Sequence, residues 1–305
     1  MRFCSRNHNR NRVGNRTIRS NEELSPSRAR KQTMEEQISP ITHLVNHHLG
    51  PLAIAVLQAL HIPSENPELP IPEPVIMAAL VLLLVMILAL ILKPRLSVEK
   101  PGRMQQVAEL LITNSMKLGI RDILDDGAGS HARSYVTVVG SVSLFILFSN
   151  LFSLFPWFSA PTGDVSAPLA CASIIFVYFN WQGIRHNGLF GYLKHFAAGT
   201  EWWIAWLIMP VEMISTLARL LSLTVRLFAN IFASDMIYGL FLSLLVQASL
   251  FAWGKSPVAG VVVGIFPVLI PFLFIALHIL VAFVQAIIFT VLPASYLGMA
   301  TAEEH

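Results

Sequence analysis

A row of polar residues runs through one long apolar stretch of the sequence, residues 197–253. Its members follow one another at intervals of three or four residues: Glu212, Ser215, Arg219, Ser222, Arg226 and Asn230. At about 3.6 residues per turn, this spacing puts all of them on one face of a helix. Ionisable groups in a membrane cost about 3 kcal/mol each on the more modest scales, and those that occur usually mark an ion path. The row therefore predicts an ion path.

Arg226 is the centre of this pattern, because an arginine keeps its proton in proteins. Asp235 lies nine residues further on, about 14 Å along a helix axis and about 180° round it. Glu212 lies about 21 Å away in the other direction. One permanent cation thus lies between two carboxylates that are far apart along the helix. Asp235 also lies on the opposite side of the helix from Arg226.

The last apolar stretch, residues 258–300, contributes His278 and Gln285, which are seven residues apart and share a helix face. We expect His278 to be the partner of Asp235 if the two helices pack side by side. Alone, such a histidine is more often a buried group with satisfied hydrogen bonds. The presence of Asp235 and Gln285 favours a functional role.

Structural interpretations stay open for several of these residues. Arg219 either belongs to the ion path or extends its charge to the lipid headgroups. The alternative for Arg226 is a buried ion pair that joins two helices. Ser222 and Asn230 are part of the path, hydrogen-bonding contacts between helices, or both.

The composition excludes a water-soluble enzyme. Of the 305 residues, 54% are hydrophobic and 13% are charged, with a mean hydropathy of +0.62, whereas soluble proteins average roughly 25% charged residues. Cys4 and Cys171 are isolated, which excludes a disulfide scaffold. No HExxH or GxSxG motif is present, and we expect no catalytic residue, cofactor or metal in this chain.

Five apolar segments are long enough to cross a membrane. Three are of ordinary length, at residues 75–92, 135–155 and 165–184. The segments 197–253 and 258–300 are longer, and the first would extend about 85 Å as one helix against a hydrocarbon core of about 30 Å. Each must break, tilt steeply or lie partly in the membrane plane. Pro267 and Pro271 predict a kink or a helix start in the last segment.

The basic residues of the body predict its orientation. Seven of the twelve that follow residue 33 lie within 93–133, and others flank the turn at 185–196. Both loops should therefore face the cytoplasm, or the matrix if the protein is mitochondrial. The segment before the first span and the loop around Asp164 should face the outer side. Apolar residues in the first basic loop have the spacing of one amphipathic surface helix; they are Val107, Leu110, Leu111, Met116 and Ile120. We predict an all-α membrane protein with about five membrane helices, the last two long and tilted or partly in-plane, plus amphipathic surface helices.

The first 33 residues differ from the rest. They hold nine of the 21 basic residues and two of the 18 acidic ones, which leaves 12 basic and 16 acidic residues in the membrane domain, 34–305. Three interpretations of this tail stay open: a disordered arm that binds nucleic acid or lipid, a transit peptide, or a stretch ahead of a true start at Met34.

Two motifs carry a resemblance to a known family. They are Ser222-Leu-Thr-Val-Arg226-Leu-Phe-Ala-Asn230 and His278-Ile-Leu-x4-Gln285-Ala-x2-Phe289. Further landmarks are Tyr296-Leu-x-Met-Ala300, Asn150-Leu-x4-Pro156, Pro161-Thr-x-Asp-Val165 and the stretch 41–50. Over residues 38–305 the chain resembles subunit a of the F-type ATP synthases. Asp235 stands where this family often has Glu, and Ser153 stands where some members have an acid, so we assign Ser153 no role.

The resemblance implies a mechanism. Subunit a of this family faces a rotating ring of small hairpin subunits (subunit c), each with one carboxyl group at mid-membrane. Arg226 would favour the ionised form of a passing ring carboxylate and block direct leakage between two half-channels. The outer half-channel would involve Asp235, His278 and Gln285. The inner one would involve Glu212 and Ser215.

The resemblance also implies partners and a location. The partners would be the ring, subunit b of the peripheral stalk and membrane lipid, with no nucleic acid, and ATP would be made elsewhere in the complex. The bacterial inner membrane is the expected location, with the mitochondrial inner membrane as the alternative. A Na⁺-translocating version of the same subunit stays open, as does a secondary ion transporter, although transporters usually show internal repeats and no convincing repeat is present.

Overall fold

The computed structural model describes residues 39–59, 70–97, 101–114, 117–129, 132–155, 158–196 and 202–301, and this part of the chain is helical. In chain order the elements are α2 (Pro40–Ala59), α3 (Glu73–Leu92), η1 (Lys93–Arg95), α4 (Arg103–Ile112), α5 (Ile120–Ala128), α6 (Ala132–Phe152), η3 (Pro161–Gly163), α7 (Ser166–Phe196), α8 (Trp202–Lys255), α9 (Pro257–Gly264) and α10 (Phe266–Thr301). The tail 1–33 and the start proposed at Met34 lie outside the described residues.

Five stretches of helix are long and apolar enough to cross a membrane, which confirms the predicted all-α membrane class. They are Glu73–Arg95, Ala132–Phe152, Ser166–Gly188, Trp206–Lys255 and Pro257–Met299. The chain is therefore a multi-pass membrane protein.

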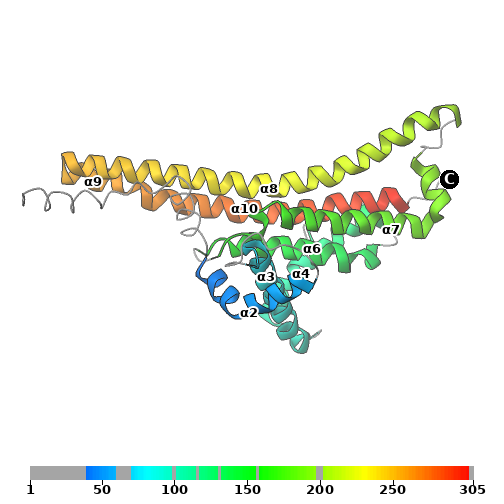
Figure 1. Ribbon diagram of the computed structural model, residues 1–305, viewed down its shortest axis with the longest axis horizontal. Helices are drawn as coiled ribbons and strands as arrows, with labels where there is room; N and C mark the ends of the chain where they lie inside the picture. Colours follow the sequence, from blue (N-terminus) through cyan, green and yellow to red (C-terminus); the bar gives the residue numbers. More distant parts are fainter. Residues whose placement is uncertain are drawn as a thin grey trace, which may run out of the picture.

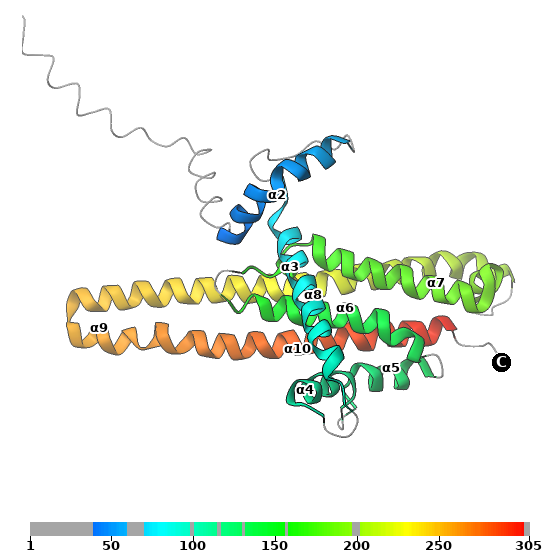
Figure 2. The same ribbon diagram turned by 90° about the horizontal axis from the view of Figure 1, so that it is seen from below.

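The two last spans form a long hairpin (Figure 1). Helix α8 continues for 54 residues, about 80 Å. Of the three alternatives predicted for this segment (a break, a steep tilt or a partly in-plane position), the structure excludes the break. Helices α8 and α10 lie side by side with α9 at the closed end, and α3 lies across them (Figure 2). For the last segment, Pro267 and Pro271 predicted a kink or a helix start. The structure has a helix start there, because α10 begins at Phe266.

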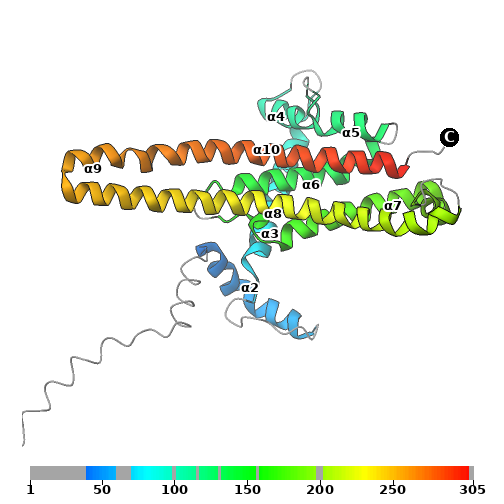
Figure 3. The same cartoon turned by 90° about the horizontal axis from the view of Figure 1, so that it is seen from above.

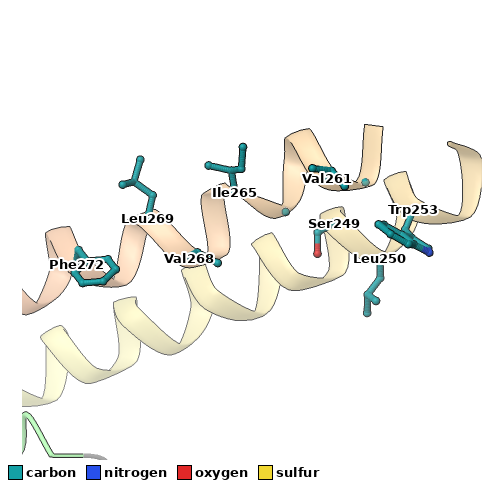
Figure 4. A pocket seen from close by; sticks show the side chains of 10 residues that line it. Ser249, Leu250, Trp253, Val261, Ile265, Val268, Leu269 and Phe272 are labelled. Carbon is teal, nitrogen blue, oxygen red and sulfur yellow. The ribbon is translucent and has the colours of Figure 1, made fainter. Parts of the chain in front are cut away.

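The other helices cover only part of this hairpin. Helix α5 packs on α10 and α7 packs on α8, while the half of the hairpin nearer α9 extends beyond both (Figure 3). Near the closed end a groove of about 540 Å³ is lined by apolar side chains with Ser249 among them (Figure 4). None of the predicted site residues lines this groove.

The basic loop 93–133 forms two surface helices where one was predicted. The break between α4 and α5 contains Lys117 with a φ of 57° and Gly119, where a Cβ atom would lie 2.6 Å from the Ile112 carbonyl oxygen. The Asp122 carboxylate accepts a hydrogen bond from the Asn114 backbone N–H at 2.7 Å. These contacts close the chain into a turn, which a pattern of apolar spacing does not reveal.

Helix α7 bends back at its end, where the predicted span stopped at residue 184. Gly188 has a φ of 69°, which glycine adopts without steric cost. The ring of Tyr192 packs directly on Gly183, where a Cβ atom would overlap it. The Tyr192 hydroxyl donates a hydrogen bond to Asn180 at 2.9 Å, and burial raises the pKa of Tyr192.

Candidate functional site

Helix α8 presents a buried face and an uncovered one. Leu223, Leu227 and Ile231 are almost fully buried, whereas Leu221 and Val225 are more than half exposed. At about 100° per residue, the polar row through Arg226 lies on the border between these two faces. Asp235 lies on the opposite border of the buried face. The row can therefore meet both the helices of this chain and whatever covers the exposed face.

Arg226 has no carboxylate partner in the described part of the chain. Its Nη2 atom lies 3.5 Å from Ser222 Oγ, at the limit of a hydrogen bond, and the side chain is half-buried. The buried ion pair considered for this residue is not found among the described residues. Ser222 and Asn230 are exposed beside it. The guanidinium charge is thus free to act on a group outside this chain.

Arg219 and Glu212 form an ion pair in the same row. Nη2 of Arg219 lies 3.2 Å from Oε1 of Glu212, and the guanidinium carbon lies 5.1 Å from the centre of the Tyr296 ring of α10. Arg219 therefore contacts protein groups in both long helices. This pairing was not foreseen, although two residues seven apart on one helix face could have suggested it. Ser215, between them in the row, is half-buried.

Asp235 of α8 and His278 of α10 lie across the hairpin from each other, close enough for their charges to interact but not joined by a hydrogen bond or ion pair among the described residues. They interact electrostatically, and aromatic contacts join the two helices at this level, with the ring centres of Tyr238 and Phe274 5.9 Å apart. The two helices therefore pack side by side, as the pairing of these residues required. An acid and a base on neighbouring helices can pass a proton between them when they are within hydrogen-bond reach or are joined by one water.

His278 also contacts the end of α6, which sequence reasoning missed. Its Nε2 atom lies 2.9 Å from Ser153 Oγ and 3.1 Å from the carbonyl oxygen of Asn150. Asn150 is fully buried and accepts a hydrogen bond from the Thr162 hydroxyl of η3 at 2.7 Å. Ser153 was given no role, and Asn150 served only as a landmark. The position of both residues in the Asn150–Pro156 motif was the feature of the sequence that could have indicated a role for them.

Gln285 is the most buried polar group of the predicted set, with no exposed surface. Neither its Nε2 nor its Oε1 atom has a hydrogen-bond partner within the described chain. A buried amide without hydrogen bonds destabilises a fold by about 1–3 kcal/mol. We therefore expect water or a partner to bind these two atoms. Gln285 lies two turns from His278 on α10 and shares its face.

The comparisons with known proteins identify the family. The family model "ATP synthase A chain" matches residues 75–298. The chain belongs to the ATP synthase A chain family. The matched region includes the polar row of α8, Asp235, His278 and Gln285. This confirms the resemblance read from the two motifs.

Curated relatives of this family match most of the chain. ATP synthase subunit a of Koribacter versatilis is 36% identical over 264 residues, which cover 87% of this chain and 97% of the relative. ATP synthase subunit a of Solibacter usitatus is 36% identical over 231 residues, 76% of this chain and 88% of the relative. ATP synthase subunit a 1 of Syntrophotalea carbinolica is 36% identical over 228 residues, 75% of this chain and 85% of the relative.

Proposed function

We propose that this chain is the proton-conducting subunit a of an F-type ATP synthase, in which Arg226 separates two half-channels. The observation that carries the proposal is the half-buried guanidinium of Arg226 at the border of an uncovered apolar face, without a carboxylate partner in the described chain. A rotating ring of c subunits, each with a mid-membrane carboxyl group, would cover this face. It would supply the missing negative charge.

The fixed cation acts through the ionisation of that ring carboxylate. A nearby positive charge stabilises the ionised form of a carboxyl group, and arginine itself does not titrate. A ring carboxyl group that reaches Arg226 therefore releases its proton, and it must take up another before it moves into lipid. Rotation is coupled to proton transfer because Arg226 also blocks direct leakage from one half-channel to the other.

The outer half-channel is formed by Asp235, His278 and Gln285. Support comes from the placement of Asp235 and His278 on facing helices, where their charges interact, and from the amide of Gln285, which has no hydrogen-bond partner in the described chain. Ser153 adds a hydroxyl group beside the imidazole. These groups can pass a proton toward the ring in short steps.

The inner half-channel is formed by Glu212 and Ser215, about three to four turns before Arg226 on the same helix face. Arg219 pairs with Glu212 there and would hold its carboxylate in place. Ser222 and Asn230 flank Arg226 and would orient its guanidinium toward the ring.

We place this subunit in a bacterial inner membrane, in contact with subunit b of the peripheral stalk and with lipid. The relatives named above are bacterial. The chain contributes no covalent chemistry to ATP synthesis. Protons are the proposed coupling ion, because the outer path carries Asp235 and His278, which both accept and release protons.

The decisive experiment replaces Arg226 with Gln in the assembled complex. ATP-driven proton pumping is measured in inside-out membrane vesicles, with Ser141→Ala as a matched control on an exposed residue of α6. We expect Arg226→Gln to abolish pumping while the complex still assembles, and Ser141→Ala to pump normally. Pumping by Arg226→Gln at the wild-type rate would overturn the proposal.

A further inference from the structure

Glu73 lies at the outer end of the first membrane span and is held by a second element. It is the first residue of α3, and its Oε1 atom accepts a hydrogen bond from Ser159 Oγ at 2.7 Å, in an exposed position. Ser159 belongs to the segment that joins α6 to η3. Glu73 precedes the region that the family model matches, residues 75–298.

The polar groups behind this contact continue inward. η3 contacts α3, α6, α7 and α8, and its Thr162 is fully buried with its hydroxyl 2.7 Å from Asn150 Oδ1. The Asn150 carbonyl oxygen lies 3.1 Å from His278. Polar groups thus run from the partly exposed Glu73 carboxylate past η3 to His278, whose charge interacts with that of Asp235.

Two buried atoms in this region lack partners. Ser149 Oγ and Asn150 Nδ2 belong to side chains with no exposed surface, and neither has a hydrogen bond to any described residue. Buried polar groups in proteins are usually satisfied by ordered water when no protein partner is present. Two such atoms at the end of α6, next to Thr162, indicate a wet interior between Glu73 and His278.

We infer that Glu73 is the residue that collects protons at the outer entrance of this path. The inference rests on the proposed function. The carboxylate takes a proton from a hydronium ion in the outer solution, which becomes water, and releases it to water inside the path. Glu73 is thereby restored to its ionised form. A negative charge that solvent can reach raises the local concentration of cations and their rate of arrival.

Few other charged groups could take this role. On the elements packed against α3, the described acidic, basic and histidine side chains at the same end are Asp164, His43, His47 and His48. Those at the opposite end or beyond are Lys93, Arg95, Arg133, Arg185 and His186. Asp164 is already engaged, since it accepts a hydrogen bond from the Ser166 backbone N–H at 2.9 Å. Hydrogen bonds from Ser166 lower the pKa of Asp164, so it stays ionised and exchanges protons poorly.

The test measures passive proton flux at different pH values on the outer side. Inside-out vesicles are stripped of the catalytic sector, their lumen, which is the outer side, is set to an acidic or an alkaline pH, and a potassium diffusion potential drives protons out. Glu73→Gln is compared with Glu73→Asp, Ser159→Ala and the matched control Asp164→Asn. Asp164→Asn removes one negative charge from the same end of the membrane helices as Glu73.

We expect Glu73→Gln to lower flux about threefold at alkaline lumen pH, where protons are scarce, and to leave it near the wild-type value at acidic pH. Glu73→Asp should restore most of the flux, Ser159→Ala should lose part of it under alkaline conditions, and Asp164→Asn should conduct normally. Equal losses in Glu73→Gln and Asp164→Asn would overturn the inference, as would a loss in Glu73→Gln that is independent of pH. Should Glu73→Gln not assemble, a normal alkaline flux in Ser159→Ala would overturn it.

The same vesicles distinguish this inference from the proposed function. Arg226→Gln is measured beside the Glu73 variants, before the catalytic sector is removed. If Arg226→Gln abolishes ATP-driven pumping while Glu73→Gln conducts like the wild type at every pH, only the role of Glu73 is overturned. If Arg226→Gln pumps normally, the proposed function itself fails.

Discussion

Nη2 of Arg219 lies 3.2 Å from Oε1 of Glu212, whereas Arg226, two turns later on the same face of α8, faces no carboxylate among the described residues. The two arginines therefore have different chemistry in spite of their similar positions. Arg219 is neutralised within its own chain. The charge of Arg226 is available to a partner.

The Glu212–Arg219 pair should show a small coupling energy. Both side chains are partly exposed, and such pairs contribute about 0–1 kcal/mol. Glu212→Gln and Arg219→Gln should each lower the thermal stability of the detergent-solubilised complex slightly, and the double variant should be little worse than either. Additive losses in this double-mutant cycle would show that the two side chains act independently.

The contribution of Asp235 to proton flux should depend on the charge of its side chain rather than on its size. Asp235→Asn removes the carboxylate that we propose exchanges protons with His278, so we expect passive proton flux to fall about tenfold or more. Asp235→Glu keeps the carboxylate on a longer side chain and should have a mild effect. Equal damage from both substitutions would instead indicate a packing role at this position.

Ser153 should orient His278. Removal of its hydroxyl leaves Nε2 with only the Asn150 carbonyl oxygen as its partner from α6, and we expect Ser153→Ala to lower proton flux about threefold to tenfold. Flux is compared with that of Ser141→Ala, since the Ser141 hydroxyl donates a hydrogen bond to the Thr137 carbonyl oxygen of its own helix. A Ser153→Ala variant that conducts like Ser141→Ala would refute this role.

Replacement of Gln285 by an apolar residue should raise the stability of the protein and lower its proton flux. The Gln285 amide is buried without a partner in the described chain, so Gln285→Leu should stabilise this subunit within the assembled complex by about 1 kcal/mol. The same change removes a polar group from the outer path and should lower proton flux. Thermal unfolding and flux are measured on the same preparation, and a variant that loses stability would show that the amide is satisfied in the membrane.

The bend at the end of α7 should tolerate no side chain at Gly183. A Cβ atom there overlaps the Tyr192 ring, and such overpacking costs about 1–3 kcal/mol. Gly191 offers a matched control, because the nearest atom to its added Cβ is 3.5 Å away. We expect Gly183→Ala to lower the melting temperature and Gly191→Ala to leave it unchanged or raise it. Equal melting temperatures would contradict the packing described here.

The sequence by itself determined the class of the protein and the order of its spans. Apolar length predicts a membrane span because lipid leaves no other partner for the backbone, so each span must satisfy its own hydrogen bonds as a helix. The row from Glu212 to Asn230 could be placed on one face because helical periodicity is a local property.

Only the tertiary structure decided which groups meet. His278 and Ser153 are 125 residues apart, and nothing in the spacing of either indicates their contact. The break between α4 and α5 and the amide of Gln285, which has no partner within the described chain, likewise depend on how the helices pack. Packing is set by the shapes of many side chains at once, whereas periodicity is set by the backbone alone.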